Sequence, residues 1–120
     1  MAELNNKFEE EIEKLKQLEK DREKYMNNRQ EMELKLTENK NVKSELDLMD
    51  EDAKIYKLIG AVLVKQDLEE AKSTVEKRLE FIANEIKRIE GSIADNGEKN
   101  LVQREKVVAL QKLLQAPQKK

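Results

Sequence analysis

Residues 53–65, with the sequence AKIYKLIGAVLVK, form the stretch that decides the fold. Their apolar residues stand in runs that include β-branched and aromatic side chains, which are enriched in strands. Gly60 lies between the two runs, at the place where a tight turn needs a glycine. Two such runs separated by a glycine predict two short strands joined as a β-hairpin.

The sequence on both sides of this stretch is charged and follows a heptad pattern. A seam, meaning a line of mostly apolar positions at spacings of four and three, runs through residues 4–46, although its middle is polar. A second seam runs through residues 68–114 and is unbroken over residues 75–93. Seams of this spacing are typical of helices packed as a coiled coil.

The two helical segments have nearly equal lengths, so folding the chain back at the hairpin places one seam on the other. In this register Arg22 lies opposite Asn96, and Leu15 lies opposite Gln103. This register collects the polar seam positions into one layer, and a polar layer costs stability and helps to set the register. The sequence therefore predicts a mainly α fold: a long antiparallel two-helix coiled coil with one β-hairpin at the connecting end.

We expect four segments along the chain. Acidic residues are disfavoured at a helix C-terminus, so the acidic run at residues 47–52 is interpreted as the end of the first helix. The spacing of Asp67 and Glu70 fits a capping box that opens the second helix. The expected segments are a helix over 1–52, a β-hairpin assembly element over 53–66, a helix over 67–115 and a disordered tail over 116–120.

Composition excludes several classes of protein. The chain has 120 residues, of which 42% are charged and 3% aromatic, too little apolar bulk for a compact globular domain. Acidic and basic residues are interspersed, so no basic stripe offers itself to nucleic acid or to a membrane. Cysteine is absent, and MAELNNKFEE lacks the apolar segment of a signal peptide. We expect a soluble, cytoplasmic protein that binds neither nucleic acid nor membrane.

The sequence contains no constellation of catalytic residues. It has neither His nor Cys, no glycine-rich phosphate loop and no cluster of metal ligands. The turn-like stretch GSIADNG at residues 91–97 has too few ligands for a calcium loop. We therefore predict no enzymatic activity, no cofactor and no metal site.

The predicted hairpin is apolar on both faces and has two unpaired edges. A lone two-stranded hairpin is marginally stable in water, and open edges invite pairing with further strands. We expect hairpins of several subunits to share one sheet, the alternative being that the hairpin packs on the helices of its own chain. The expected assembly residues are Ile55, Tyr56, Leu58, Ile59, Gly60, Val62, Leu63 and Val64.

The segment KIYKLIGAVLVKQDLEEAKSTVEKRLEFIANEIKRIE, residues 54–90, resembles the β-class subunits of prefoldin. The match is strongest in YKLIG and VLVKQ, and the helix–hairpin–helix layout extends it over nearly the whole chain. One departure is Ala61, where the family often has proline.

This resemblance implies a hexamer of two α-class and four β-class subunits, whose hairpins build a double β-barrel from which six coiled coils extend. It also implies that the complex binds unfolded or nascent polypeptides, actin and tubulin above all, at the coiled-coil tips without ATP. It then passes them to the cytosolic group II chaperonin.

The two ends of the chain meet at the predicted tip. Val108 and Leu113 lie off the seam there, so the apolar surface is wider than two helices cover, and such surfaces tend to bind partners. The other apolar residues of the tip also fit an ordinary role in closing the coiled coil. The expected client-binding residues are Leu4, Phe8, Val107, Val108, Leu110, Leu113 and Leu114.

Two further functions are compatible with a helical hairpin. A purely structural or scaffolding coiled coil without client binding is the first, and the β-hairpin counts against it. A helical arm that grips RNA is the second, and the missing basic face counts against it.

Overall fold

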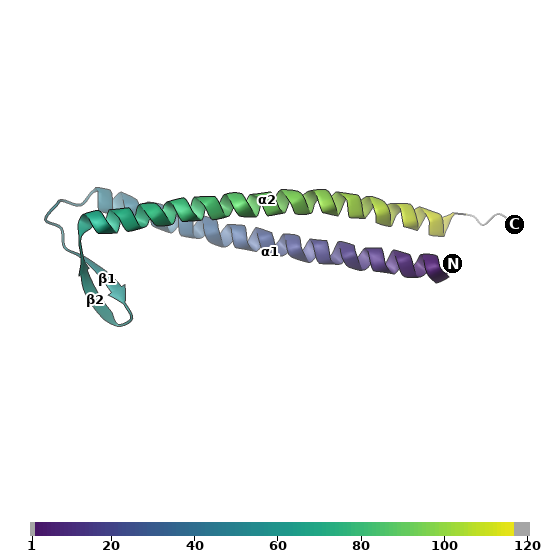
Figure 1. The fold of residues 1–120 in the computed structure, drawn as a ribbon, viewed down its shortest axis with the longest axis horizontal. Coiled ribbons are helices and arrows are strands. Elements are labelled where there is room, and N and C mark those ends of the chain that lie inside the picture. Colours follow the sequence, from purple (N-terminus) through teal and green to yellow (C-terminus); the bar gives the residue numbers. More distant parts are fainter. Residues whose placement is uncertain (1, 117–120) are drawn as a thin grey trace. The chain divides into compact units, whose positions relative to one another are not determined.

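The computed structural model describes residues 2–116. Its elements, in chain order, are α1 (Ala2–Asp47), β1 (Ile55–Ile59), β2 (Val62–Gln66) and α2 (Leu68–Gln115) (Figure 1). This order confirms the predicted mainly α fold, with two long helices and a two-stranded hairpin between them. Residues 117–120 of the expected tail lie outside the described residues.

β1 and β2 pair antiparallel, from Ile55 opposite Gln66 to Ile59 opposite Val62. Two residues therefore form the turn, and Gly60 has a φ of 61° while Ala61 keeps a negative φ. Positive φ at the first central residue alone is the pattern of a type II′ turn, which suits the twist of a hairpin. Ala61 is thus compatible with this turn, because only the glycine position needs left-handed backbone.

α1 ends at Asp47, before the expected limit at residue 52. Its last turn contains no basic residue, so nothing there complements the negative end of the helix dipole. The backbone leaves the helix through tight turns, in which the N–H of Leu48 donates to the oxygen of Glu45 at 3.2 Å. The N–H of Ala53 then donates to the oxygen of Asp50 at 2.9 Å.

α2 is continuous from Leu68 to Gln115, through the stretch that contains Gly91 and Gly97. Its first backbone bond runs from the N–H of Ala71 to the oxygen of Asp67 at 2.9 Å, so the helix opens where the capping pattern predicted. Acidic residues in the first turn and Lys112 in the last turn complement the helix dipole at both ends.

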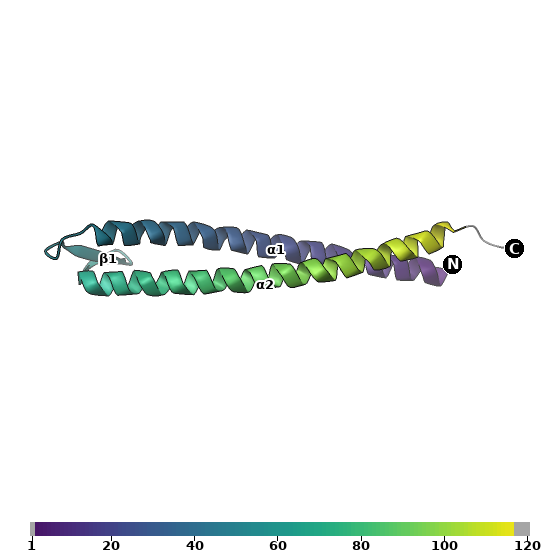
Figure 2. The ribbon, with the colours of Figure 1, turned by 90° about the horizontal axis from the view of Figure 1, so that it is seen from above.

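The chain divides into two compact units. The terminal unit joins α1 up to Asn28 with α2 from Ile89, and the hairpin unit is Arg29–Arg88. Within each unit, parts of α1 and α2 run side by side in opposite directions (Figure 2). Each unit is therefore an antiparallel helix pair.

The core of the hairpin unit lies where both helices meet the strands. Leu46 of α1 packs there with Leu68, Ala71 and Val75 of α2, all of them buried. Ile55 of β1 and Leu79 of α2 pack against this cluster and are partly buried. Ile55 is the strand residue in contact with this cluster, so its packing joins β1 to the two helices.

The terminal unit contains a buried polar layer. Gln103 donates from Nε2 to the main-chain oxygen of Glu11 at 2.8 Å and also to the Glu11 carboxylate. Asn96 donates from Nδ2 to the main-chain oxygen of Leu18 at 3.0 Å. Its buried members are Glu11, Asn96, Asn100 and Gln103.

This layer corrects the predicted register. Arg22 was expected opposite Asn96 and Leu15 opposite Gln103, but each observed partner on α1 lies four residues nearer the N-terminus. The seam repeats at spacings of four and three, so a displacement of one seam position keeps seam on seam. The hydrogen bonds to the main chain decide between these registers, and a heptad pattern does not reveal them.

Candidate protein-interaction surfaces

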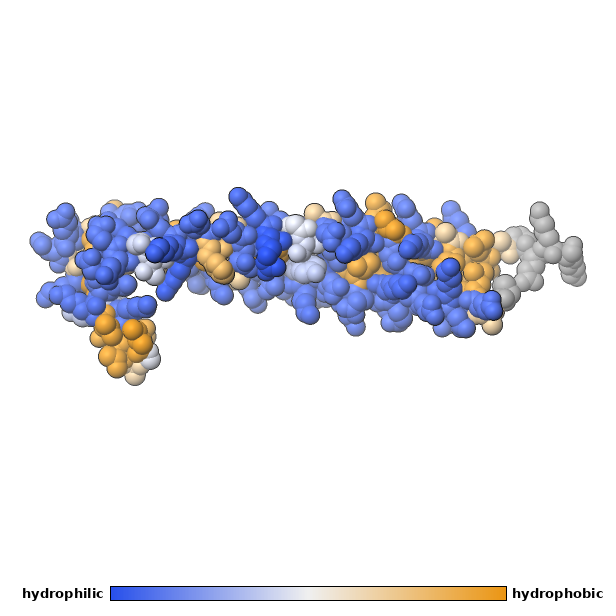
Figure 3. All heavy atoms as spheres, in the orientation of Figure 1, coloured by the Kyte–Doolittle hydropathy of each residue, from blue (hydrophilic) through white to orange (hydrophobic). Residues whose placement is uncertain are grey.

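The hairpin exposes apolar side chains on both faces. Leu58 and Leu63 lie directly opposite each other and are 66% and 65% exposed. On the other face Ile59 lies opposite Val62, and both are exposed. In Figure 3 the hairpin is hydrophobic, whereas the visible helix surfaces are mostly hydrophilic. The residues expected to mediate assembly and found exposed are Tyr56, Leu58, Ile59, Gly60, Val62, Leu63 and Val64.

Ile55 is the exception among these predicted assembly residues. It is half-buried and packs on the helical core of its own unit. The alternative interpretation was that the hairpin packs on the helices of its own chain. This is true of Ile55, the first residue of β1, and the other predicted assembly residues are exposed.

Each strand of the hairpin has one open edge. Within residues 2–116 the sheet consists of β1 and β2 alone, so the outer backbone groups of each strand have no strand beside them. Open edges of this kind are templates for pairing with further strands. The open edges of the hairpin can pair with another β-strand, and its exposed apolar faces can be covered by apolar residues of another chain.

The second predicted surface is the terminal cluster, the seven apolar residues near the two chain ends. Val108 and Leu113, the two that lie off the seam, are 46% and 60% exposed. The other members are half-buried, which agrees with their position on the seam; they are Leu4, Phe8, Val107, Leu110 and Leu114. The structure therefore brings an exposed apolar pair onto α2 beside the end of the coiled coil.

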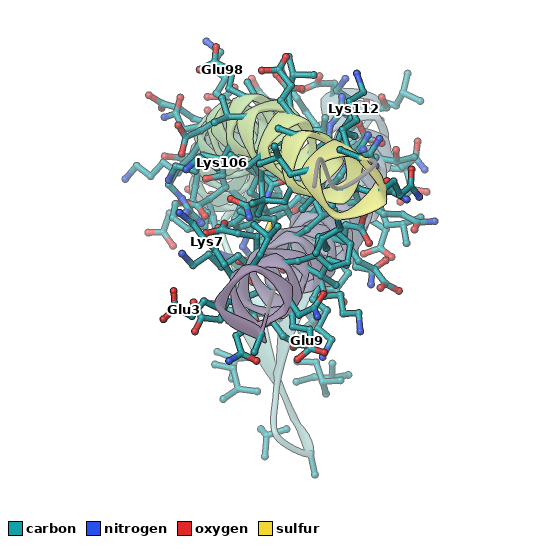
Figure 4. The ribbon with its side chains drawn as sticks, turned by 90° about the vertical axis from the view of Figure 1, so that its right-hand side faces the viewer. Glu3, Lys7, Glu9, Glu98, Lys106 and Lys112 are labelled. Atoms are coloured by element: carbon teal, nitrogen blue, oxygen red, sulfur yellow. The ribbon has the colours of Figure 1, made fainter. Side chains whose placement is uncertain are left out.

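Charged side chains lie beside Leu110 of this cluster. Lys7 of α1 and Lys106 of α2 line a shallow pocket together with Glu11, Ala109 and Leu110. Figure 4 shows the labelled Lys7 and Lys106 on the same side of the terminal unit. The hydrogen bond from Gln103 lowers the pKa of Glu11; burial opposes this shift, and Lys14 adds to it.

Three exposed apolar residues of α2 were not predicted. Leu101 and Val102 are exposed in the terminal unit, and Phe81 is 63% exposed in the hairpin unit. All three lie off the predicted seam, so the rule that singled out Val108 and Leu113 also finds them. The exposed apolar surface of α2 therefore begins well before the chain end.

Two kinds of site are absent from the part of the chain that the structure describes. Among residues 2–116 no group of three or more acidic, His or Cys side chains is placed to hold a metal ion. No described helix is both long and apolar enough for a membrane span. What the geometry provides is a helix–hairpin–helix chain with exposed apolar residues on the hairpin and on α2 near the chain ends.

Comparison with known proteins identifies the family. The prefoldin subunit family model matches residues 9–116. A probable prefoldin subunit 6 of Caenorhabditis briggsae is 70% identical over 109 residues, which cover 91% of this chain and 85% of that protein. Prefoldin subunit 6 of Homo sapiens is 48% identical over 119 residues, covering 98% of this chain and 92% of that protein.

A solved structure agrees on the fold. The prefoldin beta subunit from Thermococcus strain KS-1 superposes with a TM-score of 0.79 at 21% identity, covering 92% of this chain and 95% of that chain. This chain therefore belongs to the prefoldin family. The resemblance of residues 54–90 to β-class subunits is confirmed, and the relatives to which the chain is similar are named prefoldin subunit 6.

Proposed function

We propose that this chain is one subunit of a hexameric co-chaperone that works without ATP. The complex combines two α-class and four β-class subunits and captures unfolded or nascent polypeptides, with actin and tubulin as typical clients. It delivers them to the group II chaperonin in the cytoplasm. Membership of the prefoldin family supports this role.

The exposed hairpin is the observation that carries the proposal. Leu58 and Leu63 present an apolar pair to solvent on a ribbon with two open edges, an arrangement stabilised by further strands. Assembly with other subunits buries these residues and completes the sheet. A scaffold made of helices alone has no use for such a ribbon.

The terminal cluster is the proposed client-binding surface. Val108 and Leu113 expose apolar area that the coiled coil does not cover. Contacts of this size are weak singly, but several arms that hold one client combine through a high effective concentration. Non-native chains expose apolar segments, so they match this surface without any sequence requirement.

Assembly is tested with Leu58→Asp/Leu63→Asp, measured by native mass spectrometry of the chain with its partner subunits. Both side chains are exposed, so we expect an intact helix pair by circular dichroism and no hexamer. The matched control is Leu34→Asp, whose parent side chain is 61% exposed on α1 and lies off the hairpin. A normal hexamer from the hairpin variant contradicts the proposal.

Client capture is tested separately, with hexamers that contain Val108→Ser/Leu113→Ser. We expect them to assemble normally and to lose much of their ability to suppress aggregation of denatured actin. Hexamers with Leu34→Ser serve as the control. Unchanged suppression by the Val108/Leu113 variant rules out the terminal cluster as the client surface.

A further inference from the structure

A groove runs along the helix pair of the hairpin unit. One part is lined from α1 by Met32, Lys35 and Asn39 and from α2 by Thr74, Lys77, Arg78, Phe81 and Ile82. A second part shares Thr74 and Arg78 with the first and continues to the hairpin, where Ile55, Tyr56 and Lys57 line it. We call both parts together the basic groove.

The α2 wall of this groove follows from helix geometry. Thr74, Lys77, Arg78 and Phe81 are spaced at i, i+3, i+4 and i+7, so they lie on one face of the helix. Met32, Lys35 and Asn39 repeat the spacing on α1. The two faces line a groove between α1 and α2, and grooves of this kind accept helical segments of other proteins.

The charge of the basic groove has one sign. Its two parts contain Lys35, Lys57, Lys77 and Arg78 and no carboxylate, although the chain as a whole has 26 acidic and 24 basic residues. Within residues 2–116 none of these four cations forms an ion pair. They are therefore available to an acidic partner.

The floor and rim of the groove are apolar. Ile82 is buried and Met32 half-buried, while Phe81 stands 63% exposed beside Lys77 and Arg78. Aromatic residues and arginine are enriched at protein interfaces, so Phe81 and Arg78 are the groove residues most suited to bind a partner.

We propose that the basic groove binds an acidic segment of another protein, in which aliphatic or aromatic anchors alternate with Asp and Glu. The anchors pack against Phe81 and Met32, and the carboxylates pair with Lys35, Lys77 and Arg78. This partner differs from the client of the terminal cluster, because it is selected by charge. The proposal does not depend on client capture, so the result of the client-capture test leaves it unchanged.

The test measures fluorescence anisotropy of a labelled fourteen-residue probe made of Asp and Glu with Leu and Phe at every fourth position. It uses the full chain assembled with its partner subunits. We expect saturable binding that weakens as ionic strength rises from about 50 to about 300 mM, because salt screens the ion pairs. Lysine analogues of the probe, and acidic analogues without Leu and Phe, should not bind.

Variants then locate the site. Lys77→Glu/Arg78→Glu should weaken binding about tenfold or more, and Phe81→Ala about fivefold. Lys40→Glu/Lys87→Glu and Leu34→Ala alter residues outside the groove, so they should stay within about twofold. If the Glu variant misfolds, Lys77→Gln/Arg78→Gln replaces it with the same expected direction.

Three results overturn the proposal. The first is unchanged affinity in both the Lys77/Arg78 and the Phe81 variants. The second is binding by the isolated chain that disappears on assembly, which makes the groove a subunit interface. The third is tighter binding of the acidic peptide of residues 45–53, ELDLMDEDA, which assigns the groove to a second copy of this chain.

Discussion

Gln103 of α2 is bonded through Nε2 to both the main-chain oxygen and the carboxylate of Glu11 on α1. One amide group therefore ties two helices together within the terminal unit. A slide of α1 by one seam position breaks both bonds, so the buried amide of Gln103 loses its partners and the Glu11 carboxylate keeps only Lys14 of its own helix at 3.3 Å, which is costly. The contact thus selects one register among several that the apolar seam alone accepts.

The first prediction concerns pH. The hydrogen bond from Gln103 holds the pKa of Glu11 below its ordinary value of 4.5, so the ionised form stabilises the folded state above pH 4.5. That contribution is lost as the pH falls through the lower folded-state pKa. The melting temperature of Glu11→Gln should therefore differ most from the parent above pH 4.5, and the gap should shrink in more acidic solution. Glu105→Gln, an exposed control, should show a small gap throughout, and a constant gap for Glu11→Gln contradicts this account.

The second prediction concerns the buried asparagines. Within residues 2–116 the side-chain nitrogen of Asn100 is buried without a hydrogen-bond partner, whereas Asn96 donates from Nδ2 to Leu18 and has a buried oxygen without a partner. Replacing Asn100 by Leu removes an unsatisfied group and adds apolar surface, so we expect about 1–2 kcal/mol of extra stability in denaturant unfolding. Asn96→Leu loses a bond and should gain less. Destabilisation by Asn100→Leu means that the amide has a partner in solution.

The third prediction contrasts glycines. A Cβ added at Gly91 or Gly97 meets nothing within 4 Å, and both lie in α2. Alanine at either position should stabilise the helix by about 1 kcal/mol, measured by thermal circular dichroism.

Gly60 also has open space around it, but its φ is 61°, so Gly60→Ala should destabilise the hairpin by about 1 kcal/mol. Hydrogen exchange of the strand amides measures that loss, and slower exchange in Gly60→Ala refutes it.

The fourth prediction separates two isoleucines on one face of β1. Ile55 packs on the core of the hairpin unit, while Ile59 is 56% exposed. Ile55→Ala should lower stability by about 1 kcal/mol, because a partly buried side chain loses packing. Ile59→Ala should change the stability of the isolated chain by less than about 0.5 kcal/mol and should act on subunit assembly instead. Equal losses from both variants in the isolated chain contradict this division.

Much of the fold follows from local rules that the sequence displays directly. The two apolar runs around Gly60 become strands, and the residues at spacings of four and three become the faces along which α1 and α2 pack. Residue spacing decides these features, so the amino-acid sequence is enough to predict them. The sequence alone left open whether the stretch with Gly91 and Gly97 loosens the second helix, and in the structure α2 runs through it.

The remaining features depend on single hydrogen bonds and on the absence of covering residues. The register follows from the bonds of Gln103 and Asn96 to main-chain oxygens, which leave no trace in a heptad pattern. The half-burial of Ile55 follows from its packing against the cluster of Leu46 and the first turns of α2, a contact that a strand pattern does not reveal. The exposure of Val108 and Leu113 was predictable from their off-seam positions, whereas their binding partners were not.

The open edges of β1 and β2 also bear on how the cell must handle this chain. A newly made copy that meets no partner carries bare strand edges beside Leu58 and Leu63, the features that promote uncontrolled aggregation. Unassembled copies are therefore the hazardous form of the protein. Such a hairpin requires that the chain is synthesised in balance with its partner subunits, or that unassembled copies are degraded promptly.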